Sequence, residues 1–422
     1  NNSCLGVRRQ TCSRARREPM SEEIDRHVTR KFEVVAKLGK GAYGIVWRAQ
    51  DKKTRETVAL KKIFDAFQNA TDAQRTYREI MFLDQMYGFE HIISLRSIMR
   101  ADNDRDIYLI FDYMETDLHA AIRANILQDI HKQYITWQSL KALKYMHSAE
   151  LLHRDMKPSN LLLNSDCLMK VADFGLARSL RDQSLPTEAD TVLTDYVATR
   201  WYRAPEILLG STKYSFAVDM WSMGCILAEM LQGKPIFPGS STINQIEKIV
   251  ELTAMPSEDE IKGISPFAPT MMMSLKNEKR SSQNQNSLQL MAGSASKRVD
   301  QLNGTQAWRA KLPSGTTEQA IDLLQKLLSF TPEERISAAQ ALEHPYVAQF
   351  HNPAVEPEAK CPVSVPIDDN EKKTTAQYRC QLYEAIANQS KGKYGAGRSA
   401  SVSTSVSGDR SSREGLSQRG AM

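Results

Sequence analysis

Short runs of alternating hydrophobic and polar residues dominate the first part of the chain. These runs lie at residues 32–36, 45–49, 57–63, 92–99 and 106–113. The first three are joined by polar or glycine-rich turns and predict an antiparallel meander. Residues 72–87 repeat apolar side chains at helical spacing, with Thr71 and Asp72 as the expected cap. Residues 20–114 therefore predict a five-stranded sheet with one helix.

Longer helical patterns follow residue 115. They lie at residues 117–124, 131–149, 216–232, 242–252, 316–329 and 335–341. Two short strand-like runs, at 161–163 and 168–171, flank a polar loop at residues 153–160. The pattern predicts an α+β protein in which a strand-rich lobe (20–114) joins a larger, mainly helical lobe (115–350). A cleft between two such lobes is a usual place for a ligand.

Several segments differ in composition from the two lobes. Residues 271–310 begin with three methionines and become Gln/Asn-rich, which predicts a polar surface insert. We expect its methionines to pack on their own lobe, and the alternative is a partner site. We expect residues 351–390 to form a C-terminal extension that packs on the lobes, with a helix at 371–387. Residues 391–422, rich in Ser, Gly and Arg, predict a disordered tail. Residues 1–19 predict a disordered basic leader outside the fold.

The net charge of +5 comes from the two ends of the chain. Residues 1–19 and 391–422 each carry a net +4, which leaves −3 on residues 20–390. Such a distribution gives no support for sequence-specific nucleic-acid binding. The six cysteines form no Cys-x-x-Cys pair, which argues against a cysteine zinc site and a disulfide framework and fits a reducing compartment. No apolar run approaches the roughly 18 residues of a membrane-spanning helix.

The polar loop at residues 153–160 places three kinds of reactive group close together. Its sequence, HRDMKPSN, supplies a carboxylate at Asp155, an ammonium at Lys157 and a carboxamide at Asn160. Together these groups can hold a hydroxyl, a phosphate and a metal ion, and they match a phosphoryl-transfer loop. The alternative is a polar surface turn in which Pro158 ends a strand. Five fixed letters in order arise by chance in about one of several thousand such chains, so the loop is interpreted as catalytic.

Residues 39–44 form a Gly-x-Gly-x-x-Gly pattern, in which backbone N–H groups can approach phosphates closely. The pattern alone is weak, because about one chain in twenty-five with this many glycines contains it by chance. The competing interpretation is a dinucleotide-binding turn, which requires a helix to follow. A strand follows here, so Gly39, Gly41 and Gly44 predict a hairpin lid over phosphates.

Three charged residues are expected to meet beneath this lid. Lys61 ends the third strand and points into the cleft, where a buried ammonium needs a counter-charge. Glu79, on the helix that follows, is the best candidate for it. Asp173 opens an Asp-Phe-Gly triplet after the run at 168–171. Because magnesium bound to ATP takes one or two carboxylates and other oxygen ligands, Asp173 and Asn160 predict a magnesium site.

A loop without apolar periodicity carries two hydroxyl residues around one acid, Thr194-Asp195-Tyr196. Such a loop suits a phosphorylation switch, because a phosphate adds about −2 charge and orders a loop by pairing with arginines. Three arginines on separate elements are expected to converge on it, namely Arg78, Arg154 and Arg178. The alternative is an ordinary exposed polar loop.

Taken together, these motifs resemble the eukaryotic protein kinase family. The match runs from Phe32 to about Phe350 with every motif in order, and it implies the bilobal kinase fold with ATP and Mg²⁺ as cofactors. Residues 194–206 (TDYVATRWYRAPE) and the sequence Glu343-His344-Pro345-Tyr346 are similar to the mitogen-activated protein kinase group. Features such as Leu127-Gln128-Asp129-Ile130-His131 resemble its atypical extracellular-signal-regulated branch.

The resemblance implies a role for each residue of the site. The catalytic set would be Asp155 as proton acceptor, Lys157 at the transferred phosphoryl group, Asn160 at magnesium, and Thr199 as a brace for Asp155. The nucleotide would be held by Leu38, Gly39, Gly41, Gly44, Val46, Ala59, Lys61, Glu79, Phe111, Asp112, Met114, Asp117, Leu162 and Asp173. Among these, Phe111 would be the gatekeeper and Asp117 would reach the ribose. Magnesium would be held by Asn160 and Asp173.

The same resemblance implies how the enzyme is switched and what it modifies. Phosphorylation of Thr194 and Tyr196, by an upstream kinase or by the chain itself, would activate it. Arg203 implies substrates in which proline follows the target Ser or Thr, because proline has no N–H to leave unpaired. The partners would be protein substrates of a monomeric intracellular enzyme, without specific nucleic acid or a membrane span. Its location would be the cytoplasm or nucleus, or the centrosome or basal body.

Two further expectations concern structure, and two alternatives concern function. The resemblance implies that Glu206 pairs with Arg335 and that Asp219 holds the catalytic loop from below. A pseudokinase scaffold is one alternative. Its sign would be a missing catalytic residue, but all four are present, namely Lys61, Asp155, Asn160 and Asp173. A cyclin-dependent kinase is the other, and Tyr196 weighs against it.

Overall fold

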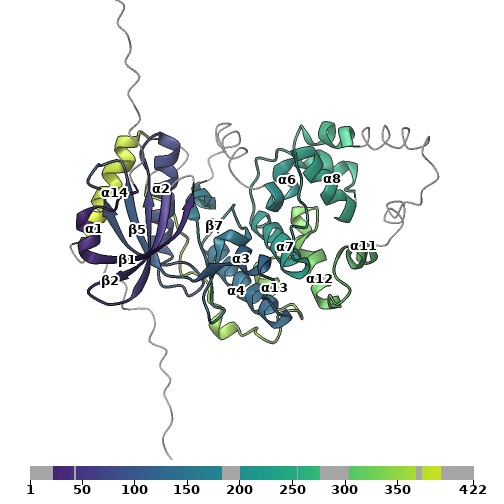
Figure 1. The fold of residues 1–422 in the computed structure, drawn as a ribbon. Helices are drawn as coiled ribbons and strands as arrows, with labels where there is room; N and C mark the ends of the chain where they lie inside the picture. Colours follow the sequence, from purple (N-terminus) through teal and green to yellow (C-terminus); the bar gives the residue numbers. More distant parts are fainter. Residues whose placement is uncertain are drawn as a thin grey trace, which may run out of the picture.

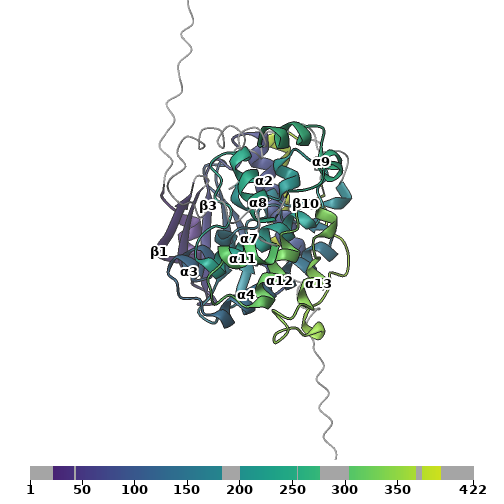
Figure 2. The same ribbon diagram turned by 90° about the vertical axis from the view of Figure 1, so that its right-hand side faces the viewer.

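The computed structural model describes residues 22–41, 44–182, 200–253, 255–275, 304–366 and 373–390. It has a strand-rich lobe followed by a mainly helical one (Figure 1), which confirms the predicted fold class. In Figure 2 the helical lobe faces the viewer. No helix within the described ranges is long and apolar enough to cross a membrane.

Five antiparallel strands form the sheet of the first lobe, in the order β1-β2-β3-β5-β4. Their bounds are β1 (Phe32–Gly41), β2 (Gly44–Asp51), β3 (Thr57–Ile63), β4 (Leu95–Arg100) and β5 (Ile107–Asp112). The meander that the alternating pattern predicted is therefore present, and the fourth strand in sequence lies at the edge beyond the fifth. This order places β3, the strand that carries Lys61, in the middle of the sheet.

Alternation along β3 and β5 assigns their side chains to two separate cores. Leu60 and Ile110 pack with Val28 of helix α1 (Arg26–Lys31) on the outer face. Because successive side chains of a strand point to opposite faces, Lys61 and its cross-strand partner Leu109 face the other way, toward the second lobe. The helix α1 itself was not predicted, since its six residues are mostly polar and only Val28 is buried.

Helix α2 (Ala70–Gln85) covers the inner face of the sheet. The cap expected at Thr71 and Asp72 is wrong, because the Asn69 side chain accepts the N–H of Asp72 and is the N-cap. Asp72 lies instead in the first turn, where a carboxylate interacts favourably with the helix dipole. The helix therefore begins earlier than the apolar period indicated.

The second lobe contains most of the helices and five short strand segments near the lobe junction. These elements are β6 (Thr116–Asp117), α3 (Leu118–Arg123), α4 (Asp129–Ser148), β7 (Leu151–Leu152), β8 (Leu161–Leu163), β9 (Met169–Val171), β10 (Arg178–Ser179), α6 (Pro205–Leu208), α7 (Ala217–Gln232), α8 (Thr242–Thr253), α9 (Glu258–Ile264), α11 (Gly304–Lys311), α12 (Glu318–Leu327) and α13 (Ala338–Leu342). Each predicted helix of this lobe is present, and α13 begins later than expected because Ser337 caps it.

Helix α7 lies in the core of this lobe and packs closely on the C-terminal end of α12. A side chain at Gly224 of α7 would meet Leu328, whose Cγ lies 2.7 Å from the position of an added Cβ. Trp221, one turn earlier, is fully buried. The glycine is therefore required by the close approach of the two segments.

Only the two ends of the predicted insert at 271–310 lie in the described part of the chain. Helix α11 begins at Gly304, inside this range, and its Trp308 is buried. Met272 is also buried, whereas Met273 is 64% exposed, so the methionine run packs on its own lobe only in part. The polar composition of the segment gave no indication that Trp308 would be buried. Residues 276–303 lie outside the described part.

Helix α14 (Thr375–Ser390) returns to the first lobe and lies against α2 and β4. Figure 1 shows it beside α2, although more than two hundred residues separate the two helices in sequence. Tyr378 and Leu382 are buried in the contact, and the ring of Tyr378 lies 5.6 Å from that of Tyr77. The helix predicted at 371–387 is therefore present in a shifted form, packed on the helix that carries Glu79. The leader and tail predicted at 1–19 and 391–422 lie outside the described residues.

Candidate functional site

A cavity of about 450 Å³ lies where the two lobes meet. Of the residues predicted for the site, its lining contains Gly41, Gly44, Val46, Lys61, Glu79, Asp155, Lys157 and Asp173. The predicted residues that do not line it are Leu38, Gly39, Ala59, Phe111, Asp112, Met114, Asp117, Asn160 and Leu162. The cavity thus brings together the groups expected at the phosphates and at the transferred phosphoryl group.

Lys61 and Glu79 form the ion pair that the sequence predicted. The Lys61 ammonium donates to Glu79 Oε1 at 2.8 Å, and the two side chains are 27% and 9% exposed. Burial alone would lower the pKa of Lys61, but the carboxylates of Glu79 and Asp173 raise the pKa above its ordinary value. The ammonium therefore stays charged and remains accessible from the cavity.

Asp173 stands opposite this pair in a backbone conformation that few residues adopt. Its φ of 67° is left-handed, which costs free energy outside glycine and is common at functional sites. Burial alone would raise the pKa of Asp173, but the nearby charges of Lys61 and Lys157 lower the pKa below its usual range. The carboxyl group is therefore an anion that can hold a cation.

The catalytic loop holds its three predicted groups in one hydrogen-bonded cluster. Asp155 Oδ2 accepts from the Lys157 ammonium at 2.6 Å and from Asn160 Nδ2 at 3.3 Å. Asn160 Nδ2 also donates to the backbone carbonyl of Asp155 at 2.8 Å. The loop is held from below by Asp219, which accepts the backbone N–H groups of His153 and Arg154 at 2.9 Å each, as predicted.

This hydrogen bonding leaves a donor set that fits a magnesium ion. The amide nitrogen of Asn160 is committed to Asp155, so its carbonyl oxygen is the atom that can act as a ligand. Asp173 adds an ionised carboxylate. Mg²⁺ prefers oxygen ligands and takes few from protein when phosphates supply the rest, so Asn160 and Asp173 suit it.

The residues expected around adenine and ribose belong to neighbouring strands. Ala59 of β3 pairs with Phe111 of β5, and Phe111 is buried. The Asp112 carboxylate accepts from Arg96 Nε at 2.7 Å, so the side chain of Asp112 is engaged away from its predicted backbone contact with adenine. Asp117 caps α3, accepting the Ala120 N–H at 2.9 Å, and this cap competes with the predicted reach to the ribose.

The predicted switch is described only in part. Thr194, Tyr196 and Thr199 lie outside the described residues, so the convergence of the three arginines on this loop stays a prediction. Arg154 lies with its guanidinium 4.2 Å from the ring centre of Tyr214. Its Nε is buried and has no hydrogen-bond partner within the described ranges. Arg78 is buried in α2, and Arg178 lies in β10.

Two further residues were not singled out from the sequence, one in the cavity lining and one outside it. Arg75 lines it, and its positive charge contributes to the low pKa of Asp173. Its position four residues before Glu79, on the same face of α2, is the signal that could have indicated it. Glu22 binds the ammonium groups of Lys37 and Lys40 on β1 at 2.9 and 2.8 Å, and these bonds lower the pKa of Glu22 to about 2.

Comparisons with known proteins identify the family of the chain. Residues 32–347 match the model of the protein kinase domain. The chain is 60% identical to extracellular signal-regulated kinase 2 of Dictyostelium discoideum over 88% of its own length and 94% of that protein. It is 50% identical to mitogen-activated protein kinase 15 of Xenopus laevis over 86% of its length, but spans only 58% of that protein. The same kinase of Caenorhabditis elegans is also 50% identical, with 87% and 73% covered.

The family match covers most of the chain, and it includes the cavity, the ion pair and the catalytic loop described above. The similarity to mitogen-activated protein kinases extends past the domain to nearly all of the Dictyostelium protein. The chain therefore belongs to the protein kinase family, and within it to the mitogen-activated protein kinases, which are ATP-dependent serine/threonine kinases.

Proposed function

We propose that this kinase transfers the γ-phosphoryl group of ATP to Ser or Thr residues that precede proline. Asp155 orients the substrate hydroxyl and accepts its proton, and Lys157 balances charge on the transferred group. Lys61, positioned by Glu79, binds the α- and β-phosphates. The observation that carries the proposal is the shared cavity, in which the charged Lys61–Glu79 pair and the ionised Asp173 lie with Asp155 and Lys157.

ATP and magnesium are supported as cofactors by the donor groups at hand. Asn160 and Asp173 would hold magnesium, which would neutralise phosphate charge. The adenine would lie in the pocket beside Val46, Ala59 and Leu162, bonded to the backbone of Asp112 and Met114. The remaining proposed nucleotide contacts are Leu38, Gly39, Gly41, Gly44, Phe111 and Asp117. Thr199 would brace Asp155.

Phosphorylation of Thr194 and Tyr196, by an upstream kinase or by the chain itself, is the proposed switch. Arg78, Arg154 and Arg178 are the proposed phosphate ligands. The position of Arg154 supports its role, because it neighbours the proposed base, and its Nε has no hydrogen-bond partner within the described ranges. The Arg154→Ala variant should keep ATP affinity but lose most of the rise in turnover on phosphorylation. An unchanged activation ratio would remove Arg154 from the switch.

The proposed division of the chain is a first lobe at 20–114, a second at 115–350 with an insert at 271–310, an extension at 351–390, and basic ends at 1–19 and 391–422. Its proposed partners are protein substrates of a monomer, without nucleic acid. The cytoplasm or nucleus, or the centrosome or basal body, is the proposed location. These statements rest on the family resemblance, together with the packing of α14 on α2 for the extension.

The proposed activity is tested with purified full-length chain, Mg²⁺ and ATP, on paired peptides that differ only in Ser-Pro or Ser-Ala. We expect phosphate on the Ser-Pro peptide and at least tenfold less on its partner. The Asp155→Asn variant should lose activity toward both while retaining nucleotide binding. Equal turnover of the two peptides would reject the proline preference, and an Asp155→Asn variant of undiminished activity would reject the proposed base.

Incubation of the bacterially expressed chain alone with ATP separates the two routes of activation. Mass spectrometry of the 194–196 segment should find phosphate on the unmutated chain but not on Asp155→Asn if the chain modifies itself. Absence of phosphate from both would assign activation to an upstream kinase.

A further inference from the structure

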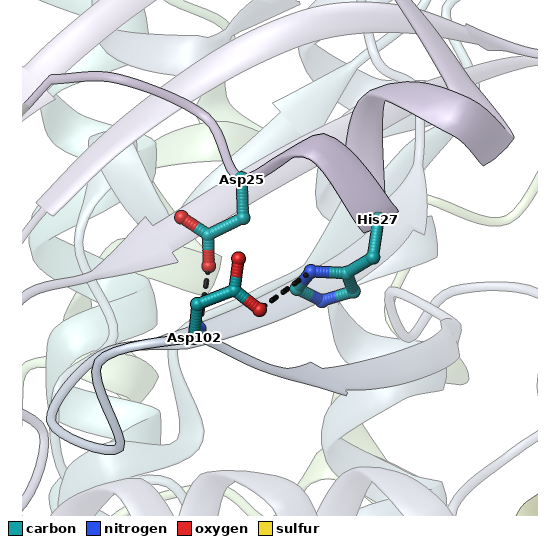
Figure 3. Close-up of side chains that lie close together, drawn as sticks. All are labelled: Asp25, His27 and Asp102. Atoms are coloured by element: carbon teal, nitrogen blue, oxygen red, sulfur yellow. Dashed lines mark hydrogen bonds and ion pairs between the residues drawn. The ribbon is translucent and has the colours of Figure 1, made fainter.

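Three side chains outside the cleft come together on the strand-rich lobe. Figure 3 shows Asp25 just before α1, His27 in the first turn of α1, and Asp102 in the turn that joins β4 to β5. One donor atom from each residue lies within 4.8 Å of the other two. None of the three lines the cavity between the lobes. The cluster therefore offers one imidazole nitrogen and two carboxylates at a place that the kinase reaction does not use.

The hydrogen bond of His27 determines which of its nitrogens can bind a ligand. Nε2 lies 2.8 Å from the carbonyl oxygen of Arg100. A carbonyl only accepts hydrogen bonds, so Nε2 carries the proton, and the lone pair of the neutral ring is on Nδ1. A backbone carbonyl bonded to one ring nitrogen is also the usual support of a histidine whose other nitrogen ligates a metal.

Nδ1 of His27 is shielded from solvent and has no hydrogen-bond partner among the described residues, although Asp102 Oδ1 lies 3.1 Å away. A hydrogen bond needs the acceptor near the N–H axis. Around a tetrahedral ion the angle between two ligand–ion bonds is about 109°. The second ligand atom therefore does not lie along the lone-pair direction of the first. Ion–ligand distances of about 2.0–2.1 Å place two such ligands about 3.3 Å apart. The observed contact fits the second geometry better.

The charges of the cluster also favour a cation. Asp25 Oδ2 accepts the backbone N–H of Asp102 at 2.7 Å, which holds the turn against the start of α1. Neither carboxylate pairs with a lysine or arginine in the part of the chain that the structure describes. The Asp102 side chain is 73% exposed, so its carboxylate can rotate and an ion can enter from solvent.

We propose that Asp25, His27 and Asp102 bind a divalent transition-metal ion of the zinc class, with solvent completing its coordination. An imidazole nitrogen suits such ions, whereas Mg²⁺ prefers oxygen ligands alone. The ion would tie the segment before β1 to the turn between β4 and β5. Arg100, at the end of β4, lies with its guanidinium 4.5 Å from the ring centre of Tyr383 in α14, so the tie would also support the surface on which α14 docks.

The test uses the full-length chain, stripped with a chelator and titrated with Zn²⁺ in excess Mg²⁺ by calorimetry. We expect one zinc ion per chain at this site, bound at least tenfold more weakly by Asp102→Asn and by His27→Gln. Asp104→Asn is the matched control, because Asp104 lies in the same exposed turn, bonds Arg100 and is not in the set. It should bind zinc like the unmutated chain. Zinc should raise the thermal unfolding midpoint of the unmutated chain and of Asp104→Asn, but not of the other two variants.

Co²⁺ in place of zinc distinguishes this site from the six cysteines. It should give visible absorption without a thiolate charge-transfer band, and the absorption should disappear in Asp102→Asn. The absence of zinc binding, equal binding by all variants, or a thiolate spectrum would overturn the proposal, as would equal weakening in Asp104→Asn. Asp102 is exposed, so its variant keeps the test decisive even if His27→Gln does not fold.

Discussion

Two buried ion pairs, one in each lobe, are built from similar charges and differ in how completely they are satisfied. Arg335 donates both ends of its guanidinium to Glu206, at 2.9 and 3.0 Å, as the sequence predicted. Its remaining N–H groups reach the carbonyls of Ser329, Ala217 and Phe330. The pair is almost wholly inaccessible, with side chains 0% and 5% exposed.

Lys61 has a single hydrogen bond, to Glu79, among the described residues, and its side chain opens onto the cavity. An ammonium has three donors, so further hydrogen bonds remain for phosphates. An ion pair whose N–H donors are all bonded within the protein can only stabilise the fold. An ion pair with donors left over keeps a charged group available to a substrate. The difference between stabilisation and function therefore lies in the unused donors, and the following changes test it.

The largest loss of stability is expected from Arg335→Ala, which leaves Glu206 buried without its partner. Breaking a buried pair costs about 3–5 kcal/mol. Urea unfolding of the full-length chain, followed by circular dichroism, measures it. Arg309→Ala is the control, because its pair with Glu318 is exposed and should change the free energy of unfolding by less than about 1 kcal/mol. Equal losses in the two variants would show that completeness of bonding does not matter here.

Lys61→Met should reduce kcat/KM by about 10²–10³ while changing stability much less, since it removes a preorganised charge at the phosphates. Lys62→Met is a matched control on the next residue of β3. Lys62 faces the outer side, 3.3 Å from Asp106, and is almost fully buried. Its loss should destabilise the first lobe and leave the kcat/KM of the folded fraction nearly intact. The reverse pattern, measured by kinetics and thermal unfolding, would contradict this distinction.

A smaller effect is expected from pH, through Asp173. Its folded pKa lies below its ordinary value of 3.8, so the carboxylate contributes stability above about pH 4 that disappears as the pH falls through the folded pKa. The free energy of unfolding of the unmutated chain minus that of Asp173→Asn should therefore be constant between about pH 5 and 8 and shrink only at lower pH. Denaturant titrations across this range measure it, and a difference that changes near pH 6 would place the carboxyl outside the charged cluster.

The smallest effect is expected from Tyr214→Leu, which removes the ring that Arg154 faces. A cation–π contact of this kind is worth about 0.5–1 kcal/mol, and the loss should appear as a shift of that size in the free energy of unfolding. Tyr214→Phe keeps the ring and serves as the control. A loss of the same size in Tyr214→Phe would assign the effect to the hydroxyl group.

Much of the fold and the proposed site followed from local patterns. The alternation around Leu60 and Lys61 placed one side chain in the outer core and the other at the cleft. The ordered motifs indicated Asp155, Asn160 and Asp173 before any distance was known. Local patterns suffice here because strand alternation and helical spacing depend on neighbours in sequence.

Other features required the tertiary structure. The sequence pattern indicated Thr71 and Asp72 as the cap of α2, and only the tertiary structure identified Asn69. The stack of Arg154 on Tyr214 and the cluster of His27 with Asp102 join residues that are far apart in the sequence. The sequence by itself determined which residues could do the chemistry of a kinase. Packing decided which charged groups keep donors or lone pairs without a partner. That outcome depends on residues brought together by folding rather than on any local pattern.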